Sequence, residues 1–171
     1  MAAGRTEGRH DHASGLDERQ PVDVLKVLAD AQKAAAGVVD AALEDIAAAA
    51  RLAADALLSG GRLVYAGAGS SGLMAMADAL ELPGTYGISR DRIVILLAGG
   101  AASLEDLAGG YEDDRLLAGS DAAATGIGPG DCVVAVSASG STPYALAIAS
   151  YAKEKGARVV ALANNPDVAL F

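Results

Sequence analysis

Short runs of β-branched apolar residues recur along the chain, and a segment with helical character separates each run from the next. The runs are Arg62–Ala66, Arg92–Leu97, Cys132–Val136 and Arg158–Ala163. None alternates cleanly between apolar and polar residues, which is typical of strands covered on both faces in a parallel sheet. Candidate helices lie between the runs, at residues 72–82, 103–108, 112–124 and 142–155. Because strands that alternate with helices favour right-handed crossovers, we predict an α/β fold with a mostly parallel sheet flanked by helices.

Two helices are predicted to precede this pattern, between Val22 and Leu58. In the second helix, apolar residues recur at spacings of three and four and form one stripe. The stripe consists of Val39, Leu43, Ile46, Ala50, Ala53 and Leu57. Ser59-Gly60-Gly61 is expected to end the helix. Two interpretations of the stripe stay open, since it can cover this chain's own sheet or pack against a partner subunit.

The two ends of the chain differ from the rest. Residues 1–20 are polar and contain both histidines with no further ligands nearby, so we predict an arm without a metal site, followed by a domain over residues 21–171. Asp167–Phe171 has the pattern of a fifth strand, yet only Asn164-Asn165-Pro166 separates it from the fourth. A parallel crossover needs about a dozen residues or more, so this segment is expected to pair antiparallel or to extend past the sheet. Because the chain stops on an apolar run with no helix to cover it, we expect it to be truncated at its C-terminus.

Charge and cysteine content exclude several classes of function. The 22 acidic residues outnumber the 13 basic ones, and the net charge of −9 argues against nucleic acid or an anionic membrane as the partner. No apolar stretch reaches the length of about 18 residues that a membrane span needs. The single Cys132 excludes an internal disulfide framework and a multi-cysteine metal site. We therefore expect a cytoplasmic α/β protein.

Two loops that follow predicted strands contain residues suited to binding an anion. The first, Gly67–Gly72, leads directly into a helix, so Gly69, Ser70 and Ser71 can offer backbone amides and hydroxyls to a phosphate. A plain tight turn is the alternative interpretation.

The second loop runs from Ser137 to Pro143 and again opens a helix. Thr142 is a plausible N-cap, with Pro143 at the first helical position. The other residues of the loop, Ser137, Ser139 and Ser141 with Gly140, can form a concave surface rich in hydroxyl groups. The two loops together can hold a phosphate and the hydroxyls of a sugar, whereas the alternative is a pair of solvated serine-rich turns.

Two glutamates are candidates for acid–base chemistry at the same edge of the sheet. Glu81 stands between two leucines just before Pro83, where the helix is expected to end. Apolar surroundings would raise the pKa of its carboxyl and suit it to act as a general acid. Glu112 follows Gly109-Gly110-Tyr111 and precedes two aspartates at a predicted helix start. Taken alone, each glutamate can equally be a structural or solvated carboxylate.

Beyond these patterns, the chain resembles a known family. Ser137-x-Ser139-Gly140-x-Thr142 after a strand is similar to the sugar isomerase (SIS) domain of phosphosugar proteins. Further stretches resemble the N-acetylmuramic acid 6-phosphate etherases within that group. They are Leu16–Glu18, Leu25–Lys33, Gly61–Gly72, Asp78–Gly87, Leu97–Gly100, Gly110–Asp113, Ala138–Tyr144 and Asn165-Pro166.

The resemblance implies a lyase that splits N-acetylmuramic acid 6-phosphate, a phosphorylated amino sugar, into N-acetylglucosamine 6-phosphate and D-lactate. It implies that Glu112 removes the C2 proton of the ring-opened sugar and that Glu81 protonates the departing lactate oxygen, with no metal or organic cofactor. It also implies a homodimer with sites near the subunit boundary. Where family members usually carry arginine, this chain has Leu73 and Ser141. Two alternatives stay open, a non-catalytic phosphosugar-binding regulator and an aldose–ketose phosphosugar isomerase.

Overall fold

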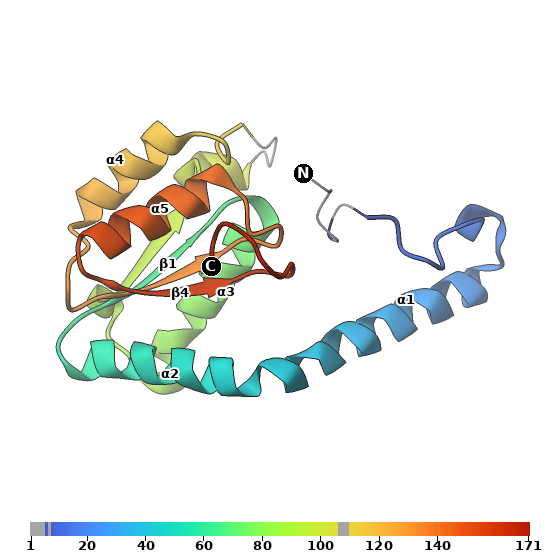
Figure 1. The fold of residues 1–171 in the computed structure, drawn as a ribbon, viewed down its shortest axis with the longest axis horizontal. Helices are drawn as coiled ribbons and strands as arrows, with labels where there is room; N and C mark the ends of the chain where they lie inside the picture. The colour runs from blue at the N-terminus through green and yellow to red at the C-terminus, as the bar shows by residue number, and fades with distance from the viewer. Residues whose placement is uncertain (1–5, 7, 106–109) are drawn as a thin grey trace. The chain divides into compact units, whose positions relative to one another are not determined.

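The computed structural model of the chain describes residue 6 and residues 8–105 and 110–171 (Figure 1). The chain divides into two compact units, residues 1–50 and 51–171. The division falls inside a helix, whereas the sequence pattern places a boundary after residue 20, which stays a prediction.

The first unit is helical over most of its described part. The short 3-10 helix η2 (Leu16–Glu18) precedes α1 (Pro21–Gly37), and the 3-10 helix η3 (Val38–Ala42) joins α1 to α2 (Leu43–Leu58). Its large apolar side chains are exposed, among them Val22, Leu25, Leu28, Val39, Leu43 and Ile46. The first half of the predicted stripe is therefore uncovered in the described part of a single chain.

The second unit contains a sheet of four parallel strands in the order β2-β1-β3-β4. The strands are β1 (Leu63–Gly67), β2 (Ile93–Leu97), β3 (Cys132–Val136) and β4 (Arg158–Leu162). Each coincides within one residue at either end with a predicted run. The predicted α/β fold with a mostly parallel sheet is confirmed.

Helices cover both faces of this sheet. Alternate strand residues such as Val64 and Val133 pack with α4 (Arg115–Thr125) and α5 (Pro143–Glu154) on one face. Their neighbours, such as Leu63 and Cys132, pack with α3 (Gly69–Tyr86) and with the end of α2 on the other. Figure 1 shows α4 and α5 on one side of the strands and α3 on the opposite side. Because alanine dominates the helix faces, the helices pack close to the strands without large side chains.

The second half of the α2 stripe covers this chain's own sheet. Ala56 is buried, and Leu52, Ala53 and Leu57 pack against the same face as α3. Of the two interpretations of the stripe, the intrachain one therefore holds for residues 52–57. The partner-subunit interpretation stays a prediction for the exposed first half.

The sequence predicted that the helix after β1 ends at Pro83, but the helix continues past this residue. α3 continues through this proline to Tyr86, and Gly87 ends it with a φ of 68°. Two bonds close the terminus, from Gly87 N–H to Pro83 O (3.1 Å) and from Ile88 N–H to Leu82 O (3.4 Å). A proline removes one hydrogen bond within a helix, and here the glycine cap one turn later sets the end instead.

The prediction of a fifth strand at Asp167–Phe171 is wrong. This segment forms turns and bends, and Asp167 has a φ of 53°. Leu170 is buried on Ala135 and Ala149, so its apolar residues pack against the end of the β3–α5 unit rather than a strand edge. The predicted helix at 103–108 is also different: the 3-10 helix η5 spans Gly100–Leu104, and residues 106–108 lie outside the described part.

An ion pair fastens the edge of the sheet where the strands begin. Asp131 accepts hydrogen bonds from the Arg62 main-chain N–H (2.9 Å) and from its guanidinium (2.7 and 3.2 Å). Arg62 also donates to Thr125 O (2.9 Å) and Gly126 O (3.1 Å) at the end of α4. Burial raises the pKa of Asp131, but the hydrogen bonds that it accepts from Arg62 outweigh this effect, so the pKa lies below its usual value.

No helix in the described part of the chain is long and apolar enough to cross a membrane.

Candidate functional site

The two predicted loops follow neighbouring strands at the carboxyl-terminal edge of the sheet. β1 and β3 pair in parallel, with Gly67 opposite Val136. The first loop leads into α3 on one face, whereas the second leads into α5 on the other. Chains that leave adjacent strands towards opposite faces open a crevice between them, where open α/β sheets bind ligands. The strand order therefore puts both loops at the switch point of the sheet.

The first loop presents backbone amides at the start of α3. The first helical bond runs from Gly72 N–H to Ala68 O (3.0 Å). Among the described residues, the N–H groups of Gly69, Ser70 and Ser71 therefore have no helical acceptor. These groups and the partial positive charge of the helix N-terminus favour an anion.

Glycine is required where α3 approaches the end of β1. A Cβ on Gly67 would lie 2.9 Å from the Cα of Gly72, and a Cβ on Gly72 would lie 2.5 Å from Leu97 Cδ1. A larger residue at either position would push the helix away from the strand. The glycines therefore fix the free amides of α3 close to the sheet edge.

The second loop is held from within by its own hydroxyls. Ser137 is buried, and its Oγ accepts the Gly140 N–H (3.1 Å) and lies 2.8 Å from Thr142 Oγ1. Ser139 Oγ accepts bonds from the N–H (3.2 Å) and hydroxyl (3.0 Å) of Ser141. Thr142 and Pro143 take the N-cap and first helical positions of α5, as predicted. Ser137 therefore shapes the loop from inside, while Ser139, Ser141 and Thr142 are at least partly accessible.

A hydrogen bond joins the two loops. Ser71 Oγ accepts the N–H of Ala138 at 3.3 Å, although 67 residues separate them in sequence. The hydroxyl of Ser71 keeps its own proton available for donation to a ligand. The structure thus brings the predicted binding residues of both loops into one place.

Glu112 lies beside both loops. Its carbonyl oxygen accepts the N–H of Tyr144 in α5 (2.9 Å), and its Oε2 lies 4.0 Å from the position that a Cβ on Gly69 would take. Tyr144 is fully buried and donates its hydroxyl to Asp121 (2.7 Å). Burial first, and then this hydrogen bond, raise the pKa of Tyr144. A rigid tyrosine therefore anchors the segment that carries the Glu112 carboxyl.

Glu81 is not at this place in a single chain. It follows Gly69 by twelve residues on α3, which is about 18 Å along the helix axis at the usual rise per residue. Its side chain is exposed and accepts a bond from Thr85 Oγ1 (3.2 Å). Leu80 and Leu82 project from other sides of the helix, because successive residues turn by about 100°. Within the described part of one chain, Glu81 therefore lacks the apolar environment expected for it.

The described segments that form the candidate site carry no basic side chain. Neither lysine nor arginine occurs in residues 67–72, 97–100, 110–114, 137–142 or 164–171. An anion at the switch point would have to be bound by main-chain N–H groups and hydroxyls.

Comparison with known families decides the classification. The model of the SIS domain matches residues 27–164. The chain belongs to the SIS-domain family.

Curated relatives of this SIS domain carry a common name. It is 42% identical over 167 residues to the N-acetylmuramic acid 6-phosphate etherase of Deinococcus radiodurans, covering 98% of this chain and 55% of the relative. The etherase of Mycolicibacterium smegmatis is 38% identical, over 98% of this chain and 56% of its own length. The SIS domain described here thus spans about half the length of the curated relatives it matches.

Solved structures share the fold. A phosphoheptose isomerase from Francisella tularensis has a TM-score of 0.68 at 22% identity, over 89% of this chain and 80% of its own. At this level of identity the similarity supports the SIS fold alone.

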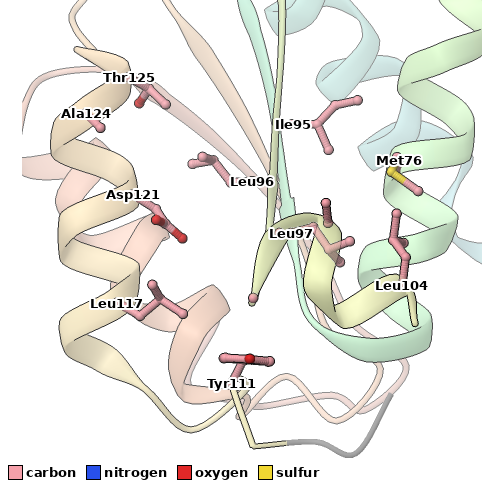
Figure 2. A pocket seen from close by; sticks show the side chains of 13 residues that line it. Met76, Ile95, Leu96, Leu97, Leu104, Tyr111, Leu117, Asp121, Ala124 and Thr125 are labelled. Atoms are coloured by element: carbon pink, nitrogen blue, oxygen red, sulfur yellow. The ribbon is translucent and has the colours of Figure 1, made fainter. Parts of the chain in front are cut away.

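A separate pocket of about 710 Å³ lies at the β2 edge of the SIS domain. Figure 2 shows apolar side chains such as Leu96, Leu97 and Leu117 around it, with the Asp121 carboxyl pointing inward from α4. None of the predicted site residues lines this pocket. An anion is disfavoured there, because the walls are apolar and Asp121 carries the same sign of charge. The switch point therefore remains the candidate site for a phosphate.

Sequence reasoning missed the segment that supports the second loop from behind. Asn165 is buried, and its side-chain amide donates to Ser139 O (3.2 Å). The only signal for this residue was that Asn165-Pro166 belongs to the resemblance, which assigns it no role.

Proposed function

We propose that this SIS domain binds the phosphate of a phosphorylated amino sugar at the switch point between β1 and β3. The observation that carries the proposal is the bond between Ser71 and Ala138, which unites two amide-rich loops in one place. Gly69, Ser70 and Ser71 would bind phosphate oxygens through N–H and hydroxyl groups, together with the hydroxyls of Ser139, Ser141 and Thr142. Gly140, whose N–H donates to Ser137, would let the loop approach the phosphate closely. Neither nucleic acid nor a membrane is a partner suited to such an acidic chain.

We further propose that the domain belongs to a cytoplasmic lyase like the etherases it matches. Its substrate would be N-acetylmuramic acid 6-phosphate in the ring-opened form. Glu112 would take the proton from C2, the C3–oxygen bond would break, and Glu81 would protonate the departing lactate oxygen. Water would then add to the unsaturated aldehyde, giving N-acetylglucosamine 6-phosphate and D-lactate. The position of the Glu112 carboxyl near Gly69 supports this role, and the chemistry requires no metal or organic cofactor.

The position of Glu81 calls for a second copy of the chain. Within one chain it is about three helical turns from the loops, too far for both glutamates to reach one sugar. We therefore propose a homodimer in which Glu81 of one subunit completes the site formed by Glu112 of the other.

Release of D-lactate tests the lyase directly. The chain is incubated with N-acetylmuramic acid 6-phosphate and D-lactate is assayed, beside a longer version that carries the segment equivalent to the rest of its relatives. Lactate release that is lost in Glu81→Gln and Glu112→Gln supports the reaction. Full release by the Glu81→Gln variant would exclude Glu81 as the acid.

A phosphosugar-binding regulator is the second candidate. It is favoured by the exposure of Glu81. This function gives binding of the sugar phosphate without lactate release. Binding that is unchanged in Glu112→Gln would support the regulator.

A further inference from the structure

The segment after β4 contacts the second loop at successive residues. The N–H of Asn164 donates to Ala138 O (2.9 Å), the side-chain amide of Asn165 to Ser139 O (3.2 Å), and the N–H of Leu170 to Gly140 O (3.1 Å). Three consecutive carbonyl groups of the loop thus accept hydrogen bonds from residues 164–170, which we call the clasp.

The clasp also packs against the loop. Gly140 has a φ of 71°, and a Cβ at this position would overlap the side chain of Val168. Asp167 adopts a φ of 53°, which is uncommon for a residue other than glycine. This turn brings Val168 and Leu170 back to the loop. A strained backbone conformation of this kind persists only where contacts with the surrounding structure hold it in place.

The direction of these bonds matters for anion binding. In a trans peptide the carbonyl and the following N–H point in opposite directions. Carbonyl groups that face the clasp therefore turn the N–H groups of the same peptides, those of Ser139, Gly140 and Ser141, away from it. The last two donate to Ser137 Oγ and Ser139 Oγ and so hold the hydroxyls of the loop in place. The carbonyl groups also keep their partial negative charges away from a phosphate, which this site must bind without lysine or arginine.

We propose that the clasp, and Asn165 above all, is a positioning element that sets the phosphate affinity of the loop at 137–142. Asn165 acts through the backbone of Ser139 and does not touch the ligand. The proposal rests on the proposed function, because it assumes that this loop binds the phosphate.

The adjacent asparagines offer a matched pair of variants. Asn165 is buried and uses its side chain, whereas Asn164 is exposed and donates from its main-chain N–H, which a side-chain change leaves in place. Asn165→Asp and Asn164→Asp add the same charge one residue apart. We expect Asn165→Asp to weaken binding of N-acetylglucosamine 6-phosphate by about tenfold and Asn164→Asp by less than about threefold.

Calorimetric titration of folded protein, with unfolding by urea measured beside it, separates positioning from a general loss of stability. A purely structural role lowers the free energy of unfolding but leaves the Kd of the folded protein unchanged. Where lactate release is measurable, we expect a higher KM with little change in kcat.

Val168→Ala gives a second variant if Asn165→Asp does not fold, and we expect it to weaken binding several-fold. Equal Kd values for Asn165→Asp and Asn164→Asp would overturn the clasp proposal, and so would an unchanged Kd in Val168→Ala. Failure of the unaltered chain to bind the sugar phosphate would instead overturn the proposed function.

Discussion

The serines of the second loop show how residues of one type take different roles. Ser137 is buried and bonds to Gly140 and Thr142, whereas Ser141 is exposed at the edge of the loop. A substitution at Ser137 therefore alters the loop itself. A substitution at Ser141 changes what a ligand meets.

Ser141→Arg is expected to strengthen binding of N-acetylglucosamine 6-phosphate. A hydrogen bond to a charged group contributes about 1.5–3 kcal/mol, and the lower end corresponds to about tenfold in Kd at an exposed site. Calorimetric titration measures the change. Ser59→Arg adds the same charge after α2, at the opposite edge of the sheet, and serves as the control. An equal gain in both variants would contradict a phosphate at the second loop.

Asp131 stabilises the fold in a pH-dependent manner. Its pKa is lower in the folded chain than in the unfolded one, so its contribution is present at neutral pH and is lost as pH falls through the folded pKa. We expect Asp131→Asn to lower the free energy of unfolding by about 2 kcal/mol at pH 7, and by less below about pH 4.

Urea unfolding at pH 7 and pH 3 checks this expectation. Asp55→Asn is the control, because Asp55 is largely exposed and lies 4.0 Å from Arg158. It should cost less than about 0.5 kcal/mol. A constant effect of Asp131→Asn across this pH range would show that the ion pair with Arg62 is not its source.

Among the elements, the strands could be predicted from sequence and the ends of the helices only in part. Runs such as Cys132–Val136 carry their own signal, since three of its five residues are β-branched valines, which favour strands. The end of α3 depended on a balance between Pro83 and Gly87 that local pattern does not resolve. Phe171 and its neighbours read as a strand, yet tertiary contacts with α5 and the loop at Gly140 decide their path.

Replacement of glycine by alanine is expected to change the free energy of unfolding in opposite directions at two positions. Gly84 lies inside α3 with open space where a Cβ would stand, so Gly84→Ala should raise the free energy of unfolding by about 0.5–1 kcal/mol. Gly140 has a positive φ and contacts Val168, so Gly140→Ala should lower it by about 2 kcal/mol. Thermal or urea unfolding of both variants measures the difference. Effects of the same sign would contradict the loop conformation described here.

At the scale of the whole molecule, the sequence could nominate residues for a candidate site but could not tell which of them lie together. Both loops were predicted from their place after strands and Glu112 from its place at a helix start, and the strand order brings the two loops together. Glu81 was predicted at the same edge, but the length of α3 carries it away. Sequence spacing does not tell how far a helix continues, so the distance between the glutamates required coordinates.

A shared site predicts that two inactive variants restore each other. Glu81→Gln and Glu112→Gln, purified separately, are mixed, dissociated and reassociated. If each site takes one glutamate from each subunit, the mixed dimers contain one intact site. About a quarter of the unaltered lactate release should return, since random reassociation makes half of the dimers mixed. Glu81→Gln mixed with itself is the control, and no recovery in the mixture would contradict a site shared between subunits.

The most direct test of phosphate binding at the switch point is a residue-resolved titration. Amide NMR resonances of the chain are followed as N-acetylglucosamine 6-phosphate is added, with N-acetylglucosamine as the unphosphorylated control. The largest shifts should fall on Gly69–Ser71 and Ser139–Thr142, with the phosphorylated sugar only. Shifts concentrated around Leu96 and Asp121 at the β2 edge, or equal shifts with both sugars, would contradict it.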